Sequence, residues 1–375
     1  MTGAERTETR PMTNGQDLGA ASPPAAAARI DAPKSGLAAG RRHVLDMDDF
    51  TREEILGVFQ NADAMTEVLN RDIKKVPTLR GKTVVTLFYE ASTRTRVSFE
   101  QAGKVLSADV INVSADSSSA KKGESLYNTA LTLQAMNADI IVIRHGHSGA
   151  PHFLARHLDA CVINAGDGTH AHPTQALLDL YTIRNHRGNI AGLKVAIIGD
   201  ALYSRVARSN LWALTTMGAE VVLCAPPTLM PLDFLDGSRF EDGHPFASLQ
   251  VESNVERALE GADVVMVLRL QLERQHAGHL PTLREYSRLY GINERRLALA
   301  KPGALVMHPG PMNEGVEIDP EVAHGARSVI EEQVTNGVAI RMALLYSMAT
   351  PARRQSERKR KSGRSVDPAQ RKMLL

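Results

Sequence analysis

The sequence predicts an α/β fold of two domains, each a parallel sheet flanked by helices. The first observation is an alternation: eight short apolar runs are mostly separated by stretches whose apolar residues recur at helical spacing. Alternation of this kind produces parallel strands joined by right-handed crossovers. The second observation is the length of 375 residues, which is too long for one compact core and suits two domains.

The predicted strands form two groups of four. They lie at 83–88, 109–113, 139–143, 160–164, 194–198, 220–224, 263–267 and 304–307. Between the groups, the turn-forming segment 185–189 is expected to be the hinge. We therefore expect a first domain over 41–186, a second over 187–348, and a last helix, about 329–346, that packs back on the first domain.

Two helices of the first domain can be placed by their start signals and apolar faces. Thr51 and Glu54 have the spacing of a capping box. The apolar face behind this box consists of Ile55, Phe59, Ala62 and Met65. A second helix is expected over 97–106, with a buried face made of Val97, Ala102, Val105 and Leu106.

Both ends of the chain lie outside this pattern. Residues 1–40 are rich in Ala, Pro and Gly without periodicity, so we expect a disordered extension. Residues 349–375 contain nine Lys/Arg against Glu357 and Asp367, and are expected to be a solvated basic tail. Such a tail can bind nucleic acid, although a nucleic-acid partner is the less expected interpretation.

The composition indicates a cytoplasmic globular protein with neither a metal nor another cofactor. No apolar run approaches the ~18 residues that a membrane span needs. Cys161 and Cys224 lie in strand-like runs, which indicates a reducing compartment rather than a disulfide framework. Cysteines and histidines do not cluster at metal-ligand spacing, so no zinc site is expected. The turn at Gly199 lacks the G-x-G-x-x-G pattern of dinucleotide-binding folds.

The junction after the first strand predicts a phosphate site. Ser92, Thr93, Arg94 and Thr95 lie where the strand 83–88 leads into a helix. Free N–H groups and the helix dipole attract an anion there, the hydroxyl groups add donors, and the guanidinium matches phosphate. The alternative is an ordinary capped helix with a solvated arginine.

Further polar residues follow other predicted strands. Arg144 comes directly after the strand 139–143, and His172 and Gln175 flank Pro173 at a helix start. A helix N-terminus disfavours imidazolium, so a neutral His172 could donate a hydrogen bond to a carbonyl oxygen. A structural cap is the alternative for this histidine.

The second group of strands adds more cations. Arg205 opens a helix, Arg269 and Gln271 follow the strand 263–267, and a His-Pro-Gly-Pro turn at 308–311 follows the last strand. Together with Lys122, these residues make a cationic site that suits a phosphate and one or more carboxylates. Such a site favours charge neutralisation and carbonyl activation over a protein nucleophile.

Six segments, in order along the chain, resemble the aspartate/ornithine carbamoyltransferase family over about residues 42–348. They are Phe88-x3-Ser-Thr-Arg-Thr-Arg96, Lys122-Gly-Glu124, Ala165 to Asp179, Ser204 to Asn210, Leu268 to Arg274 and His308 to Pro311. The resemblance implies attack of the L-aspartate amine on carbamoyl phosphate, giving N-carbamoyl-L-aspartate and phosphate, a step of pyrimidine synthesis. It implies no metal and no covalent intermediate.

The resemblance also implies roles for individual residues. It assigns carbamoyl phosphate to Ser92, Thr93, Arg94, Thr95, Arg144, His172, Gln175, Gly310 and Pro311. It assigns aspartate to Lys122, Arg205, Arg269 and Gln271. Within the first set, the implied catalytic residues are Arg94, Thr95, Arg144 and His172.

The implied working unit is a homotrimer with shared sites, because Lys122 and Ser118 resemble residues that the family supplies from a neighbouring subunit. Regulatory chains or dihydroorotase are possible further partners. Glu90 is expected to pair with Arg205 as the two halves close on both substrates.

Two alternatives stay open. An ornithine or other amine carbamoyltransferase shares the phosphate motif, but Arg269 would repel a cationic acceptor. A non-catalytic paralogue acting as a scaffold would be marked by loss of Arg94, Arg144 or His172, and all three are present.

Overall fold

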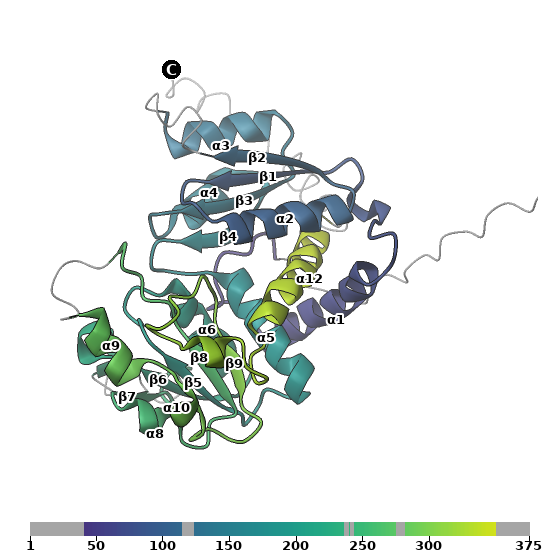
Figure 1. The fold of residues 1–375 in the computed structure, drawn as a ribbon. Helices are drawn as coiled ribbons and strands as arrows, with labels where there is room; N and C mark the ends of the chain where they lie inside the picture. Colours follow the sequence, from purple (N-terminus) through teal and green to yellow (C-terminus); the bar gives the residue numbers. More distant parts are fainter. Residues whose placement is uncertain (1–40, 115–123, 236–239, 241–243, 275–281, 350–375) are drawn as a thin grey trace, which may run out of the picture. The chain divides into compact units, whose positions relative to one another are not determined.

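The structure is a computed structural model that describes residues 41–114, 124–235, 240, 244–274 and 282–349 (Figure 1). The predicted N-terminal extension, the basic C-terminal tail and the candidate residues Ser118 and Lys122 lie outside the described residues.

The first domain is built on a four-stranded parallel sheet in the order β2-β1-β3-β4. Its strands are β1 (Thr83–Phe88), β2 (Asp109–Ser114), β3 (Ile140–His145) and β4 (Cys161–Asp167). Successive side chains of β1 point to opposite faces, as the pleat requires. Val84 and Phe88 pack with the core shared by the long helices, whereas Val85 and Leu87 pack toward α3 (Leu126–Ala135) and α4 (Ala150–His157).

The second domain contains a five-stranded parallel sheet in the order β7-β6-β5-β8-β9. Its strands are β5 (Lys194–Ile198), β6 (Glu220–Cys224), β7 (Gln250–Glu252), β8 (Val264–Val267) and β9 (Leu305–Met307). Its described helices are α6 (Arg205–Thr216), α7 (Leu232–Leu235), α8 (Val255–Leu259), α9 (Leu283–Tyr290), α10 (Glu294–Leu297) and α11 (Pro320–Ala323). The second domain therefore has one strand more than predicted.

Long helices join the two sheets. The chain leaves the first sheet through α5 (Pro173–Arg187). The last described helix, α12 (Ile330–Ala349), packs on α1 (Arg52–Leu69), α2 (Thr93–Val105) and α5. The prediction that the last helix packs back on the first domain is confirmed, as is the two-domain α/β fold. None of the described helices is both long and apolar enough to cross a lipid bilayer.

Local start signals were predicted correctly. Thr51 and Glu54 form both hydrogen bonds of the capping box at the start of α1. The apolar face predicted behind the box is buried at all its positions, Ile55, Phe59, Ala62 and Met65. Pro173 is the first residue of α5, where its fixed φ angle and missing N–H are harmless.

Two local predictions were wrong, and the hinge at 185–189 stays a prediction. In the structure, residues 185–187 are the last of α5, and Gly188 is its C-cap with φ 74°. Val97 is 52% exposed, because it lies five residues before Ala102 and therefore on another face of α2, which buries Ser98 and Phe99 in its place. The edge strand β7 was missed because its three residues are mostly exposed and carry no apolar run.

Truncating a buried residue of α12 tests how strongly this helix holds the first domain. Leu344 is fully buried in the core that α12 shares with α1, α2 and α5. We expect Leu344→Ala to lower the free energy of unfolding by about 2–5 kcal/mol, because a cavity replaces the side chain. Urea unfolding measures the change. The control Leu56→Ala, at a 39% exposed position of α1, should change stability by no more than about 0.5 kcal/mol; equal losses would contradict the packing described.

Candidate active site

One cavity of ≈ 1040 Å³ lies at the carboxyl ends of strands from both sheets. Open parallel sheets commonly bind ligands at this edge. The cavity brings together the described residues predicted for both substrates: Ser92, Thr93, Arg94, Thr95, Arg144, His172, Gln175, Arg205, Arg269, Gln271, Gly310 and Pro311. Residues that the sequence analysis did not assign also line it, among them Ser98, Glu273, Arg274, Gln333 and Arg341.

The N-terminus of α2 forms one wall of this cavity. Ser92 occupies the N-cap position, but its side chain makes no capping hydrogen bond with the helix. The interpretation of Ser92 as an ordinary helix cap is therefore wrong, and Ser92 lines the cavity together with Thr93 and Arg94. A helix N-terminus with hydroxyl groups and a guanidinium around it can hold a phosphate dianion.

The turn after β9 closes over Arg94. Arg94 Nη1 donates a hydrogen bond to the carbonyl oxygen of Pro309 at 2.6 Å. Gly310 has φ 60°, and a Cβ atom at this position would overlap the Arg94 guanidinium. Glycine is needed here for both its backbone angle and its lack of a side chain.

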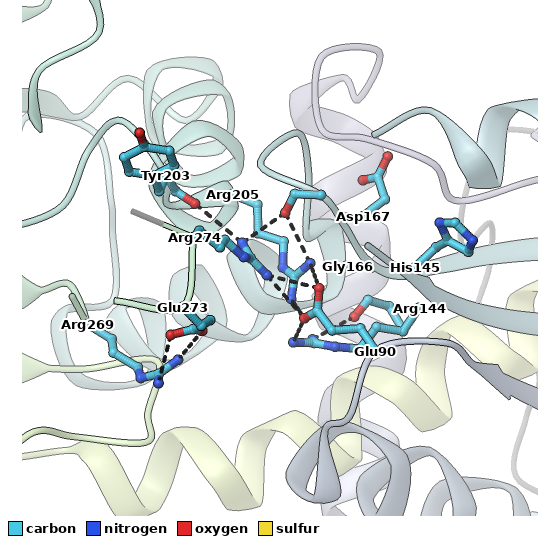
Figure 2. A network of polar contacts seen from close by, with 12 residues as sticks. Glu90, Arg144, His145, Gly166, Asp167, Tyr203, Arg205, Arg269, Glu273 and Arg274 are labelled. Atoms are coloured by element: carbon cyan, nitrogen blue, oxygen red, sulfur yellow. Dashed lines mark hydrogen bonds and ion pairs between the residues drawn. The ribbon is translucent and has the colours of Figure 1, made fainter. Parts of the chain in front are cut away.

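A single carboxylate, that of Glu90, binds three arginines (Figure 2). Arg144 Nη2 donates to Glu90 at 2.6 Å, and Arg274 Nη2 donates to both carboxylate oxygens at 3.0 and 3.1 Å. Arg205 makes two further bonds to Glu90, one of them at 3.2 Å. The predicted Glu90–Arg205 pair is thus present, and its coupling to substrate binding stays a prediction.

These contacts determine the charges in the site. Burial alone would raise the pKa of Glu90, but the hydrogen bond from Arg205 and the charges of all three arginines lower it. Burial and the nearby Arg205 lower the pKa of Arg144 to about 9, although Glu90 opposes the shift. Glu90 is therefore an anion at neutral pH, and it offsets part of the repulsion among the arginines.

The backbone at the end of β4 and just after it binds the same arginines. The Ala165 carbonyl accepts a bond from Arg144 at 3.1 Å. The Gly168 carbonyl accepts bonds from Arg205 at 3.1 Å and from Arg274 at 2.9 Å. Gly166, with φ 115°, allows close approach, because a Cβ atom there would lie 2.9 Å from Arg205 Nε.

His172 faces this group of cations as a neutral ring. It occupies the N-cap position of α5 without making a side-chain cap, so the capping alternative is wrong for this histidine too. Burial, and then the charges of Arg144 and Arg205, hold the pKa of His172 well below its usual value. Its Nδ1 atom is buried with no hydrogen-bond partner among the described residues. A neutral imidazole can donate one hydrogen bond to a carbonyl oxygen.

Arg269 and Gln271 lie on the segment after β8, on another wall of the cavity. Arg269 forms an ion pair with Glu273, with an Nη1–Oε1 distance of 2.8 Å (Figure 2). Glu273 and Arg274 belong to the segment in which the sequence analysis singled out Arg269, so their proximity in sequence could have indicated them.

The buried carboxylate of Asp179 fixes the side chain of Gln175. Asp179 accepts hydrogen bonds from Gln175 at 2.8 Å, from Gln333 at 2.7 Å and from Asn210 at 2.8 Å. Gln333 Oε1 in turn accepts the backbone N–H of His308, at the start of the turn that contacts Arg94. Residues of α5, α6 and α12 thereby fix one side of the cavity.

Two protein-family models match this chain. The family model for the carbamoyl-phosphate-binding domain of aspartate/ornithine carbamoyltransferases matches residues 42–185, and that for the Asp/Orn-binding domain matches residues 191–348. The chain belongs to the aspartate/ornithine carbamoyltransferase family. It is 59% identical over 309 residues to the aspartate carbamoyltransferase catalytic subunit of a Roseiflexus species, covering 82% of this chain and 95% of that one.

Solved structures of the carbamoyltransferase family share the fold. Aspartate transcarbamoylase from Trypanosoma cruzi, in complex with carbamoyl phosphate and aspartate, has a TM-score of 0.74 and 30% identity, with 84% of this chain and 98% of that chain covered. Ornithine carbamoyltransferase from Pyrococcus furiosus has a TM-score of 0.72 and 29% identity, covering 82% of this chain and 96% of that chain.

The environment of Asp179 predicts a pH dependence of stability. Burial raises the pKa of Asp179 from 3.8 to about 6, against the effect of its three hydrogen bonds. The folded chain therefore holds a proton that the unfolded chain releases near pH 3.8. The stability contributed by the neutral carboxyl group is present at lower pH and is lost as pH rises through about 6.

The variant Asp179→Asn removes this titration. As pH rises from about 3.8 to about 6, the free energy of unfolding of the unsubstituted chain should fall relative to that of Asp179→Asn. The expected fall is roughly 3 kcal/mol, at ~1.4 kcal/mol per pH unit. Urea unfolding of both proteins across this range measures the difference. Parallel stability curves would contradict the raised pKa.

Proposed function

We propose that this chain is an aspartate carbamoyltransferase, which converts carbamoyl phosphate and L-aspartate to N-carbamoyl-L-aspartate and phosphate in cytoplasmic pyrimidine synthesis. One observation carries the proposal: arginines from both domains line a single cavity, with a phosphate-type site at one wall and Arg269 with Gln271 at another. The names of the relatives at 59% identity and of the ligands in the Trypanosoma cruzi complex support the choice of substrates.

In this proposal the N-terminus of α2 binds the phosphate group. Ser92, Thr93, Arg94 and Thr95 supply hydroxyl groups, backbone N–H groups and a guanidinium at one place. Gln175 and the Gly310–Pro311 turn bind the amino end of the carbamoyl group. The contacts from Pro309 to Arg94 and from Asp179 to Gln175 support this arrangement, because they fix both groups before substrate binds.

Aspartate would lie on the side of Arg205, Arg269 and Gln271. Arg205 already has one carboxylate partner in Glu90, so its contact with a substrate carboxylate requires sharing or exchange of this partner. Arg269 has Glu273 as a partner in the same way. A substrate dianion would therefore compete with protein carboxylates for both arginines, which favours aspartate over acceptors with a single negative charge.

The reaction proposed is direct attack of the aspartate amine on the carbamoyl carbon. Arg144 and neutral His172 donate hydrogen bonds to the carbonyl oxygen, on which negative charge develops in the tetrahedral transition state. The C–N bond forms, the bond from carbon to the phosphate oxygen breaks, and phosphate leaves with that electron pair. The amine must lose a proton, and the departing phosphate is a base positioned to accept it.

The assembly and the domain limits remain part of the proposal. We propose a homotrimer with shared sites, in which Lys122 and Ser118 reach a neighbouring subunit's cavity, and domains over 41–186 and 187–348. Its support is the sequence resemblance, since both of these residues lie outside the described part of the chain.

The proposed acceptor can be tested by phosphate release. Purified full-length chain with carbamoyl phosphate should release phosphate with L-aspartate and not with L-ornithine, because Arg269 would repel the ornithine ammonium group. Release with ornithine alone would overturn the assignment of the acceptor. No release with either amine, from a folded chain, would favour a non-catalytic scaffold protein.

Two variants should separate catalysis from aspartate binding. His172→Ala should lower kcat by about 10²–10³, the usual cost of one oxyanion donor, with a small change in the KM for aspartate. Arg269→Ala should chiefly raise the KM for aspartate, because it removes a cation and leaves Glu273 as an anion in the cavity. Steady-state kinetics with both substrates measures these effects.

The matched control is Arg295→Ala. Arg295 pairs with Glu256 on the surface, where its side chain is 71% exposed, and it should leave both constants unchanged. An unchanged aspartate KM in Arg269→Ala would contradict the role proposed for Arg269.

A further inference from the structure

A second group of ligating side chains lies beside the loop that binds the catalytic arginines. His152 on α4, Asp167 at the end of β4 and His170 each offer one ligand atom, and these atoms all lie within 4.8 Å of one another. The proposed reaction does not use any of these side chains directly. The three residues are spread along the sequence, which explains why ligand spacing predicted no metal site.

The His170 ring is held by carboxylates on both of its nitrogen atoms. Its Nε2 lies 3.1 Å from Asp46 Oδ2, and its Nδ1 lies 3.1 Å from Asp167 Oδ2. In metal sites, a carboxylate on one ring nitrogen commonly orients the histidine and leaves the other nitrogen for the metal. Asp46 occupies this outer position, and a bound ion would replace the hydrogen bond that now joins His170 Nδ1 to the Asp167 carboxylate.

His152 supplies the third ligand. Its Nδ1 atom is buried and has no hydrogen-bond partner among the described residues. The rings of His152 and His170 meet edge to face, with their centroids 5.5 Å apart. A buried nitrogen without a partner is costly, and a metal ion would satisfy it.

The local charge suits a divalent cation. Asp46 and Asp167 are both buried, and Asp48 lies near enough to interact with the charges of His152 and His170. Two imidazoles and one carboxylate are ligands for zinc and similar transition metals, rather than for calcium or magnesium, which prefer oxygen.

We propose that His152, Asp167 and His170 bind a zinc-class divalent ion, with Asp46 holding the His170 ring from the outer side. Zinc–nitrogen bonds of about 2.0–2.1 Å place tetrahedral ligands closer together than 4.8 Å, so His152 must approach the other two residues on binding. A fourth position is then open to water or another small ligand.

Such an ion would fix the turn at the end of β4, from Ala165 to Gly168, without touching the substrates. Asp167 lies between Ala165 and Gly168, whose carbonyls bind Arg144, Arg205 and Arg274. Asp167 already accepts bonds from Asn164 and from the Gly149 N–H, each bond fixing the same turn. Gly149 is the N-cap of α4, and the ion would add a second link to this helix through His152.

Metal content tests the proposal directly. Tag-free full-length chain, loaded with zinc and then dialysed against metal-free buffer, should retain one zinc ion per chain by elemental analysis. Cobalt loading should give the visible absorption of a four-coordinate site with nitrogen and oxygen ligands. His152→Ala and His170→Asn should lose both signals, and zinc should raise the melting temperature of the native chain but not of His152→Ala.

The matched control is His157→Ala, an exposed histidine on the same helix as His152, which should retain the zinc and the cobalt spectrum. Zinc content at background level in the native chain would overturn the proposal. So would equal zinc retention by a folded His152→Ala. Circular dichroism establishes folding, and His152→Gln replaces His152→Ala if the alanine variant is unfolded.

Discussion

The active-site cavity depends on one electrostatic constraint: several arginines must stay close together although they repel one another. The Glu90 carboxylate meets this constraint by binding Arg144, Arg205 and Arg274 at the same time. These three arginines come from β3, from the start of α6 and from the segment after β8, so one acidic side chain joins residues of both sheets. Removing one partner of such a buried group typically costs more than its net stabilisation, since the remaining charges are left uncompensated.

Backbone carbonyl oxygens add to the charge compensation that the Glu90 carboxylate gives the arginines. Ala165 and Gly168 present carbonyl oxygens to the same arginines, and glycine at 166 lets the guanidinium groups come close. Fixed dipoles of this kind are oriented during folding and need no rearrangement during a reaction. The same surroundings keep His172 neutral, because burial and nearby cations both disfavour imidazolium.

Local patterns in the sequence were sufficient to predict most of the strands and helices of the fold. Strands such as 83–88 and 194–198 were placed correctly because continuous β-branched runs leave little choice of structure. Val97 was misplaced because its spacing of five residues from Ala102 does not keep it on the same helix face, and β7 is too short and polar to give a signal. The described residues predicted for the site were singled out through their motifs, and they line one cavity. Arg341 and Asp179 were not assigned roles, because a single buried charge in a helix gains meaning only from contacts that are distant in sequence.

The return of α12 to the first domain has a mechanical consequence. The polypeptide passes between the two sheets twice, outward through α5 and back through α12, and these two helices pack against each other. A single connection would leave one domain free to swivel on the other. Two adjacent connections that pack on each other instead oppose rotation of one domain about the other.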